Sequence, residues 1–206
     1  FDMDGVLFDT EKYYYDRRAN FLAQKGISID HLPPSFFIGG NTKQVWENIL
    51  RDDYDNWDVP TLQEEYNAYK QDNPLPYKEL IFPDVFKVLN EVNSRGLKIG
   101  LASSSVKADI LRALEENHLN GFFDVVLSGE EFKESKPNPE IYLTALKHLN
   151  VEANQALIIE DSEKGIAAGV AAGVEVWAIK DNRFGMDQGA AKGLLDNLMD
   201  VLDLLK

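Results

Sequence analysis

Two aspartates near the start of the chain, Asp2 and Asp4, are the first residues whose type and spacing could do chemistry. In the run FDMDGVLFD they stand at i and i+2 at the end of an expected strand, where both side chains point the same way. One carboxylate could attack phosphorus to give an acyl-phosphate, and the other could protonate the leaving oxygen and later deprotonate water. Such a pair is just as typical of acids in a turn, so other residues must decide.

Polar residues also follow three later segments that are expected to be strands. They are Ser103, Ser104, Ser105, Lys136, Glu160 and Asp161. In open α/β sheets ligands bind at the carboxyl ends of the strands, so we expect these side chains to converge with Asp2 and Asp4.

Converging acids repel one another, which is costly in a cleft of low dielectric unless a cation lies among them. Carboxylate oxygens suit a hard cation, and Mg²⁺ is the common choice beside phosphate. Ser103, with Ser104 beside it, and the free amides of the following helix start would hold a phosphate, while Lys136 would bind a phosphate oxygen.

Taken singly, these residues have ordinary structural interpretations. Lys136 alone is typical of a surface lysine, and Ser105 of a helix N-cap. Glu160 and Asp161 are typical of acids at a helix start. The ordered set, with each member at a strand end, favours the functional interpretation.

Charge and composition narrow the classes of partner. The chain has 206 residues, a net charge of −14 and no cysteine, which excludes disulfides and thiolate metal sites. So acidic a chain is repelled by nucleic acid and by anionic membranes. No apolar run approaches the ~20 residues of a membrane span. We therefore expect a cytoplasmic protein, monomeric or weakly dimeric, whose partner is a small phosphorylated substrate.

Strand and helix signals alternate after residue 76, which predicts a parallel α/β sheet. Strands are expected at 97–102, 124–128, 156–160 and 174–179, and helices at 83–94, 106–117, 139–149, 163–172 and 190–205. Residues 12–76 carry no strand signal and are expected to form a helical insertion, whose helices span 11–25, 42–53 and 61–72.

Four segments carry a resemblance to a known family: DMDGVLFDT, LASSS, SKPNPEIY and IIEDSEKGIAAGVAAG. In this order and spacing the chain resembles the haloacid dehalogenase superfamily of phosphotransferases, and in particular its β-phosphoglucomutase-like branch with a helical cap. The resemblance implies an α/β fold with a Rossmann-like parallel core of residues 1–11 and 77–206, and an inserted, mobile helical cap domain of residues 12–76.

The resemblance also implies roles for individual residues. Asp2 would be the nucleophile and Asp4 the acid and base, with Ser103 and Lys136 on the phosphate. Magnesium would be held by the Asp2 carboxylate, the Asp4 main-chain carbonyl and Asp161, with Glu160 in direct or water-mediated contact. Dehalogenases of the superfamily lack the second aspartate, since a halide leaving group needs no proton, so Asp4 favours phosphate chemistry.

The cap departs from the mutase pattern. β-Phosphoglucomutases carry a His early in the cap and an Arg in the cap loop, whereas this chain has Tyr14 and, near the second place, Thr42 and Lys43. A mutase must grip both phosphates of a bisphosphate, and one lysine does this less well than a bidentate arginine. Phosphonatases of the superfamily use a cap lysine as a Schiff base, so Lys43 leaves that alternative open, although an exposed lysine at a helix start is the commoner interpretation.

Substrate contacts from the cap are expected from Asn41, Lys43 and Tyr14, although Tyr14 and Trp46 stand at helical spacing and are more typical of core aromatics. We predict a Mg²⁺-dependent phosphatase of small phosphorylated metabolites, such as sugar phosphates. The first alternative is a β-phosphoglucomutase-type phosphomutase. A phosphonatase or a non-catalytic binding protein is less favoured, the latter because both Asp2 and Asp4 are present.

Overall fold

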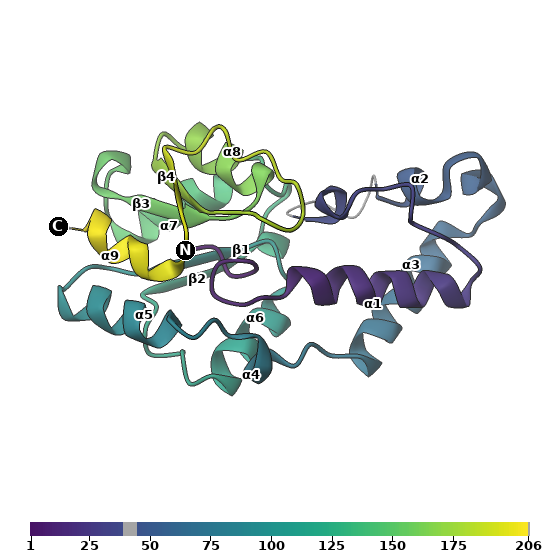
Figure 1. Ribbon diagram of the computed structural model, residues 1–206, viewed down its shortest axis with the longest axis horizontal. Coiled ribbons are helices and arrows are strands. Elements are labelled where there is room, and N and C mark those ends of the chain that lie inside the picture. Colours follow the sequence, from purple (N-terminus) through teal and green to yellow (C-terminus); the bar gives the residue numbers. More distant parts are fainter. Residues whose placement is uncertain (39–44, 206) are drawn as a thin grey trace.

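The computed structural model describes residues 1–38 and 45–205, which form a larger part built on parallel strands and a smaller helical part (Figure 1). The strands are β1 (Gly100–Ser103), β2 (Val125–Ser128), β3 (Leu157–Glu160), β4 (Glu175–Ile179) and β5 (Gly193–Leu195). The helices of the described residues are α1 (Glu11–Gln24), α2 (Val45–Leu50), α3 (Val59–Asp72), α4 (Tyr77–Leu80), α5 (Val85–Ser94), α6 (Lys107–Glu116), α7 (Glu140–Leu149), α8 (Glu163–Ala171) and α9 (Val201–Leu204).

The first two residues join two groups of parallel strands into one layer. β1 pairs with β2, and β4 pairs with β3 on one side and β5 on the other. The amide of Ala102 in β1 donates to the carbonyl of Phe1 at 3.0 Å, and the amide of Asp2 donates to the carbonyl of Ile159 in β3 at 2.9 Å. The order is therefore β2, β1, Phe1–Asp2, β3, β4, β5, which places Asp2 at the centre of the sheet.

Alternation along the strands builds a hydrophobic core on each face of this sheet. Leu101 and Ile159 belong to a cluster with apolar residues of α5, α6 and α9. Their neighbours Ala102 and Ile158 belong to a second cluster, with residues of α7 and α8. Two layers of helices thus enclose a parallel sheet, which confirms the predicted α/β fold class.

The smaller part has a hydrophobic cluster of its own, built from α1, α2 and α3. Trp46 is 4% exposed within it and donates its indole N–H to Gln63 at 2.8 Å, so this residue packs in the core as the helical spacing suggests. Helices predicted at 11–25 and 61–72 are confirmed as α1 and α3. The predicted cap contacts Asn41 and Lys43 lie outside the described residues, as does Thr42. In the part of the chain that the structure describes, no helix combines the length and apolarity needed to cross a membrane.

The helix predicted over 190–205 is confirmed only near its end, where α9 spans Val201–Leu204, and is wrong for the residues before it. Residues 193–195 instead extend the sheet as β5, and the amide of Lys180 donates to the carbonyl of Leu195 at 2.9 Å. Gly193 fits there because the Trp177 ring covers it, at 2.4 Å from the place of a Cβ. Helical structure resumes only after Asn197, whose side chain accepts from the amide of Met199. Pairing at the sheet edge therefore overrides the helix propensity of a leucine-rich segment.

Candidate active site

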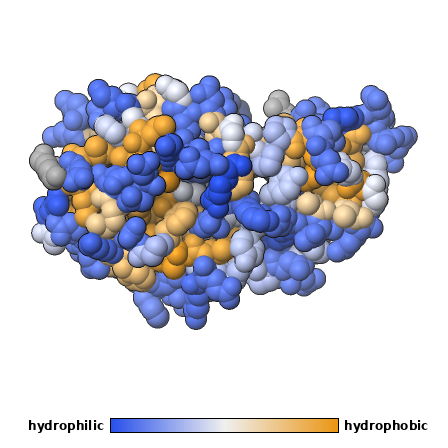
Figure 2. Space-filling model, viewed as in Figure 1, coloured by the Kyte–Doolittle hydropathy of each residue, from blue (hydrophilic) through white to orange (hydrophobic). Residues whose placement is uncertain are grey.

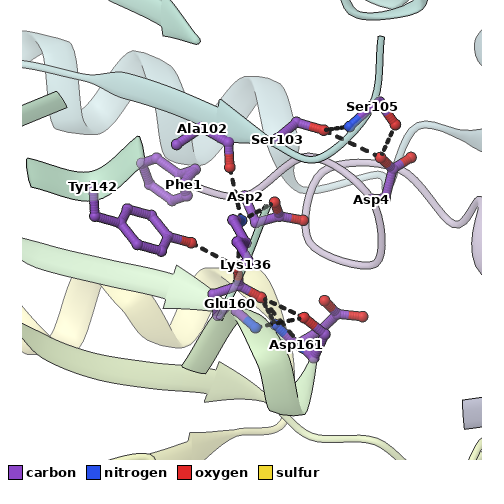
Figure 3. Close-up of polar contacts among 12 residues, drawn as sticks. Phe1, Asp2, Asp4, Ala102, Ser103, Ser105, Lys136, Tyr142, Glu160 and Asp161 are labelled. Atoms are coloured by element: carbon purple, nitrogen blue, oxygen red, sulfur yellow. Dashed lines mark hydrogen bonds and ion pairs between the residues drawn. The ribbon is translucent and has the colours of Figure 1, made fainter. Parts of the chain in front are cut away.

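Lys136 is the centre of a buried polar network at the carboxyl ends of the strands (Figure 3). Its Nζ donates to Asp2 Oδ1 at 2.7 Å, to Glu160 Oε1 at 2.6 Å and to the carbonyl of Ala102 at 2.9 Å. An ammonium group has three donors, so all of them are used. Burial acts to lower the pKa of Lys136, but the charges of Asp2 and Glu160 outweigh it and hold that pKa well above its usual range.

Glu160 is fully enclosed, and its carboxylate accepts five hydrogen bonds. Besides Lys136, the hydroxyl of Tyr142 donates to Oε1 at 2.6 Å. Its Oε2 accepts from the amide of Asp161 at 3.0 Å and from the amide and hydroxyl of Ser162 at 3.3 and 3.2 Å. Burial alone would raise the pKa of Glu160, but Lys136 and these donors bring it below its ordinary value. Glu160 therefore stays ionised and fixes Lys136.

Asp2 has one occupied and one available oxygen. Lys136 binds Oδ1, while no donor among residues 1–38 and 45–205 reaches Oδ2. Burial raises the pKa of Asp2 to about 7; Lys136 opposes that shift, and the charges of Glu160 and Asp4 add to it. Proton affinity of this kind in a buried carboxylate marks a place where a positive charge would be stabilising.

Asp4 lies among three hydroxyl groups. Thr10 donates to Oδ1 at 2.7 Å. Ser105 and Ser103 donate to Oδ2 at 2.7 and 3.3 Å (Figure 3). Burial raises the pKa of Asp4 even though these hydrogen bonds oppose the shift. Asp4 can therefore hold a proton more readily than an exposed aspartate, as a general acid requires.

Among the acids of the site, Asp161 is the one that a bound cation would stabilise most. It is 5% exposed, and within the described ranges no side chain or amide donates to its carboxylate. Burial, together with the charges of Glu160, Glu11, Asp2 and Asp4, raises its pKa well above the ordinary value. Oxygens of Asp2, Glu160 and Asp161 lie within 4.8 Å of one another. A set of oxygen donors with an unpaired buried carboxylate fits a hard divalent cation such as Mg²⁺.

Gly5 allows Asp161 to approach the first loop. Its φ of +76° belongs to the left-handed region, and a Cβ there would lie 1.9 Å from Asp161 Oδ2. Glycine suits this position for two reasons: the backbone has a positive φ, and the Asp161 carboxylate leaves no room for a Cβ.

The three serines at the carboxyl end of β1 have different surroundings in the structure. Ser103 is enclosed, and its Oγ accepts from the amide of Ser105 at 3.0 Å. Ser104 is exposed and lines the cavity. The alternative interpretation of Ser105 as a helix N-cap is wrong, because Val106 occupies the N-cap of α6 and the Ser105 hydroxyl donates to Asp4.

A cavity of about 200 Å³ opens over these residues. Asp2, Asp4, Lys136 and Asp161 line one part of it, and side chains of α1 and α3 line another, including Tyr14. The Tyr14 hydroxyl lies 3.2 Å from Ser105 Oγ, so this residue of α1 belongs to the site. A larger cavity of about 850 Å³ lies at the opposite end of the sheet, around Leu97 and Leu204. None of the four acids Asp2, Asp4, Glu160 and Asp161 lines it.

Several residues of the site could not be identified from their residue type alone. Tyr142 and Thr10 lie inside the segments SKPNPEIY and DMDGVLFDT, so the motifs could have identified them. Gln188 could not be found this way: its amide donates to the carbonyls of Asp161 and Ile179 at 2.6 and 2.7 Å, from a loop without a recognisable pattern.

The chain is similar to a hydrolase family, to proteins named as phosphatases and to a solved phosphoglucomutase. The family profile described as haloacid dehalogenase-like hydrolase matches residues 1–179. A phosphorylated carbohydrates phosphatase of Thermotoga maritima is 29% identical over 100% of this chain and 96% of its own length. A phosphoglycolate phosphatase of Aquifex aeolicus is 29% identical over 85% of this chain and 80% of its own. The solved structure of a β-phosphoglucomutase from Clostridium difficile has a TM-score of 0.80 and 27% identity, covering 96% of this chain and 89% of that one.

The family and the relatives named as phosphatases indicate a phosphoric monoester hydrolase. The profile match extends from the paired aspartates to the end of β4. The chain belongs to the haloacid dehalogenase-like hydrolase family.

Proposed function

We propose that the chain is a Mg²⁺-dependent phosphatase of small phosphorylated metabolites that works through an aspartyl-phosphate on Asp2. The observation that carries the proposal is the state of the Asp2 carboxylate. Lys136 fixes one oxygen at 2.7 Å, while the other has no donor in the described part of the chain. A carboxylate held in this way is oriented for in-line attack on phosphorus.

Asp4 is proposed as the general acid and then the general base. It stands two residues after the nucleophile, and its raised pKa lets it keep a proton for the departing alcohol oxygen. The carboxylate that remains can then accept a proton from the water that cleaves the acyl-phosphate. The three hydroxyls around Asp4 can hydrogen-bond either protonation state, since a hydroxyl both donates and accepts.

Asp2, Asp161 and the main-chain carbonyl of Asp4 are proposed to hold Mg²⁺. When bound, the ion would neutralise charge on the phosphoryl oxygens and on the acid cluster. Glu160 is the least suited of the predicted ligands, because its carboxylate already accepts five hydrogen bonds. Its proposed part is to keep Lys136 and the chain around Asp161 in place, with any contact to the ion through water.

Ser103, Ser104 and Lys136 remain the proposed phosphate contacts. Ser104 is exposed to the cavity and free to donate, whereas Ser103 must leave Asp4 to do so. All three Lys136 donors are used in the structure, so a phosphoryl oxygen would replace one of its present acceptors, with Asp2 Oδ1 the nearest to the reaction. Lys136 would then stabilise both the nucleophile and the group transferred to it.

Residues 12–76 are proposed to act as a mobile cap over a core of residues 1–11 and 77–206. The separate hydrophobic cluster of α1, α2 and α3 supports this division, and the cavity takes residues from both sides of it. On the surface in Figure 2 the two parts are distinct, with hydrophilic side chains where they meet. Closure would exclude bulk water during phosphoryl transfer.

Sugar phosphates are the proposed substrates, on the strength of the Thermotoga maritima relative's name. A phosphomutase is the second candidate, favoured by the similarity to the Clostridium difficile β-phosphoglucomutase. Tyr14, at the place where mutases carry histidine, lines the cavity and disfavours that candidate.

Replacing the nucleophile tests the proposed function. Asp2→Asn keeps the size of the side chain but cannot form an acyl-phosphate, so Mg²⁺-dependent phosphate release should fall by orders of magnitude. Asp16→Asn, an exposed change on α1, is the control and should retain activity. Activity in Asp2→Asn above about a tenth of the wild-type level would refute the mechanism.

A further inference from the structure

Three cations from the helical part line the cavity beside the acids. Arg17 and Arg18 lie on α1, and Lys70 lies on α3. None of them has a carboxylate within 4.0 Å among the residues that the structure describes, although nine other lysines and arginines form ion pairs there. The chain has 35 acidic and 21 basic residues, so a shortage of acids does not explain why these three cations form no ion pair.

Aromatic rings and a carbonyl hold these cations without neutralising them. The Arg18 guanidinium lies over the rings of Phe37 and Tyr66, 4.8 and 5.5 Å from their centroids. The Lys70 ammonium lies 5.3 Å from the Tyr66 centroid. Such contacts orient a cation and leave its N–H donors available to a ligand.

Arg17 has an unsatisfied hydrogen-bond donor. Its Nη1 donates to the carbonyl of Asn73 at 3.1 Å, and its guanidinium lies 5.4 Å from the centre of the Tyr14 ring. Its Nε is buried without a hydrogen-bond partner, the one side-chain atom of this kind in the described part of the chain. A buried N–H without a partner is destabilising, and an oxygen of a bound ligand would satisfy it.

The three cations also lie close enough to repel one another. Burial and then the charge of Arg17 lower the pKa of Lys70, with a smaller contribution from Arg18, while the charge of Asp109, which also lines the cavity, opposes them. Like charges gathered in one cavity are stabilised when an anion lies among them.

We propose that Arg17, Arg18 and Lys70 bind a second anionic group of the substrate while its phosphoryl ester lies at Asp2. This rests on the proposed function and names its substrate class: small metabolites with one phosphate ester and a second anionic group, either a carboxylate or another phosphate. Arginine suits both groups, because its planar fork matches two oxygens at once. The cavity volume of about 200 Å³ limits the substrate to a small molecule.

Substrate pairs that differ only in the second group provide the test. For a carboxylate the pair is 3-phosphoglycerate and glycerol 3-phosphate; for a phosphate it is glucose 1,6-bisphosphate and glucose 6-phosphate. In at least one pair the member with the second anionic group should have a kcat/KM about tenfold higher or more, since hydrogen bonds to charged groups are worth about that much. The pair that shows the preference identifies the group.

Removal of charge should abolish this preference. Arg18→Gln and Lys70→Met should raise KM for the preferred substrate about tenfold and change KM for its partner less than about twofold. Arg18→Lys should restore part of the preference. Lys12→Met is the matched control, because Lys12 lies on the same helix but pairs with Asp16 and does not line the cavity. The wild type's failure to prefer either substrate with a second anionic group would overturn the proposal, as would equal loss on both members of a pair.

Binding separates this proposal from the proposed function. Calorimetry on Asp2→Asn measures affinity for the same four compounds without turnover. A preference for a compound with a second anionic group that disappears in Asp2→Asn/Arg18→Gln supports the cation site even if no phosphate is released by the wild type. Equal affinities in both proteins would refute the cation site and leave the phosphatase mechanism standing.

Discussion

Gly165 in α8 lies directly against the carboxylate of Glu160. A Cβ on Gly165 would be 1.9 Å from Oε1 and 2.2 Å from Oε2 of that carboxylate. Gly165→Ala should therefore push Glu160 away from Lys136 and lower the free energy of unfolding by about 1–3 kcal/mol, the usual cost of overpacking. Urea unfolding measures the change, and phosphate release should fall with it because Lys136 loses its anchor.

Gly121→Ala is the control for this experiment, since nothing lies within 4 Å of the place of its Cβ. It should leave the unfolding midpoint almost unchanged. Equal stability of Gly165→Ala and the wild type would show that Glu160 can move at no cost.

Tyr142→Phe removes a single hydroxyl from the network. The Tyr142 hydroxyl donates to Glu160 Oε1 at 2.6 Å, and its ring lies 4.8 Å from Lys136 Nζ. Because the ring remains, only the hydrogen bond to a buried charge is lost, and the free energy of unfolding should fall by about 1–3 kcal/mol. Denaturant unfolding measures this fall, and a change smaller than the error of the measurement would mean that the hydroxyl contributes nothing to the network.

The free energy of unfolding without divalent cations should fall as the pH rises. Asp2 holds its proton more tightly in the folded protein, with a pKa of about 7 against an ordinary value of 3.8. The stabilising contribution of such a group is complete below the unfolded pKa and is lost as the pH rises through the folded pKa. For Asp2 this window runs from about pH 4 to about pH 7, and Asp161 shifts in the same direction.

Magnesium should reverse that loss, because an ion that binds only the folded state raises the melting temperature. Protons compete with the ion for the same carboxylates, so the gain should be larger at pH 8 than at pH 5. Asp161→Asn should flatten the pH profile in chelator and remove most of the gain from Mg²⁺. A melting temperature that is indifferent to Mg²⁺ at pH 8 would contradict the proposed metal site.

Hydrolysis and isomerisation can be measured in one assay. With β-glucose 1-phosphate, release of inorganic phosphate should exceed formation of glucose 6-phosphate, with or without added glucose 1,6-bisphosphate. The reason lies in the proposed cap, where Tyr14 takes the place at which the resemblance to mutases leads us to expect a histidine, so water is expected to reach the proposed phosphoenzyme. Isomerisation roughly a hundredfold faster than hydrolysis would establish a mutase instead.

The positions of the polar residues at the strand ends could be predicted from the sequence because they follow a general rule of parallel sheets. Glu160 and Ser103 each end a short apolar strand, and the carboxyl ends of such strands share one edge. Lys136 comes from a loop, so its three acceptors depend on tertiary contacts that no local pattern encodes.

Cations of the helical part could not be recognised in the same way. Arg17, Arg18 and Lys70 read as ordinary polar positions of two helices, and only the packing of α1 against α3 brings them to one cavity. The β5 strand also could not be predicted from local sequence. Its three residues, Gly193–Leu195, owe their conformation to pairing with β4 rather than to their own propensity.

Trapping of the phosphoenzyme tests the role of Asp2 most directly. Asp4→Asn with 4-nitrophenyl phosphate is the suitable combination, because 4-nitrophenolate departs without a proton while hydrolysis of the acyl-phosphate lacks its base. After acid quench, mass spectrometry should find one added phosphoryl group on the peptide that contains Asp2, removable by hydroxylamine, and none in Asp2→Asn/Asp4→Asn. A burst of 4-nitrophenolate with no modified Asp2, or with the phosphoryl group on another residue, would contradict the proposed mechanism.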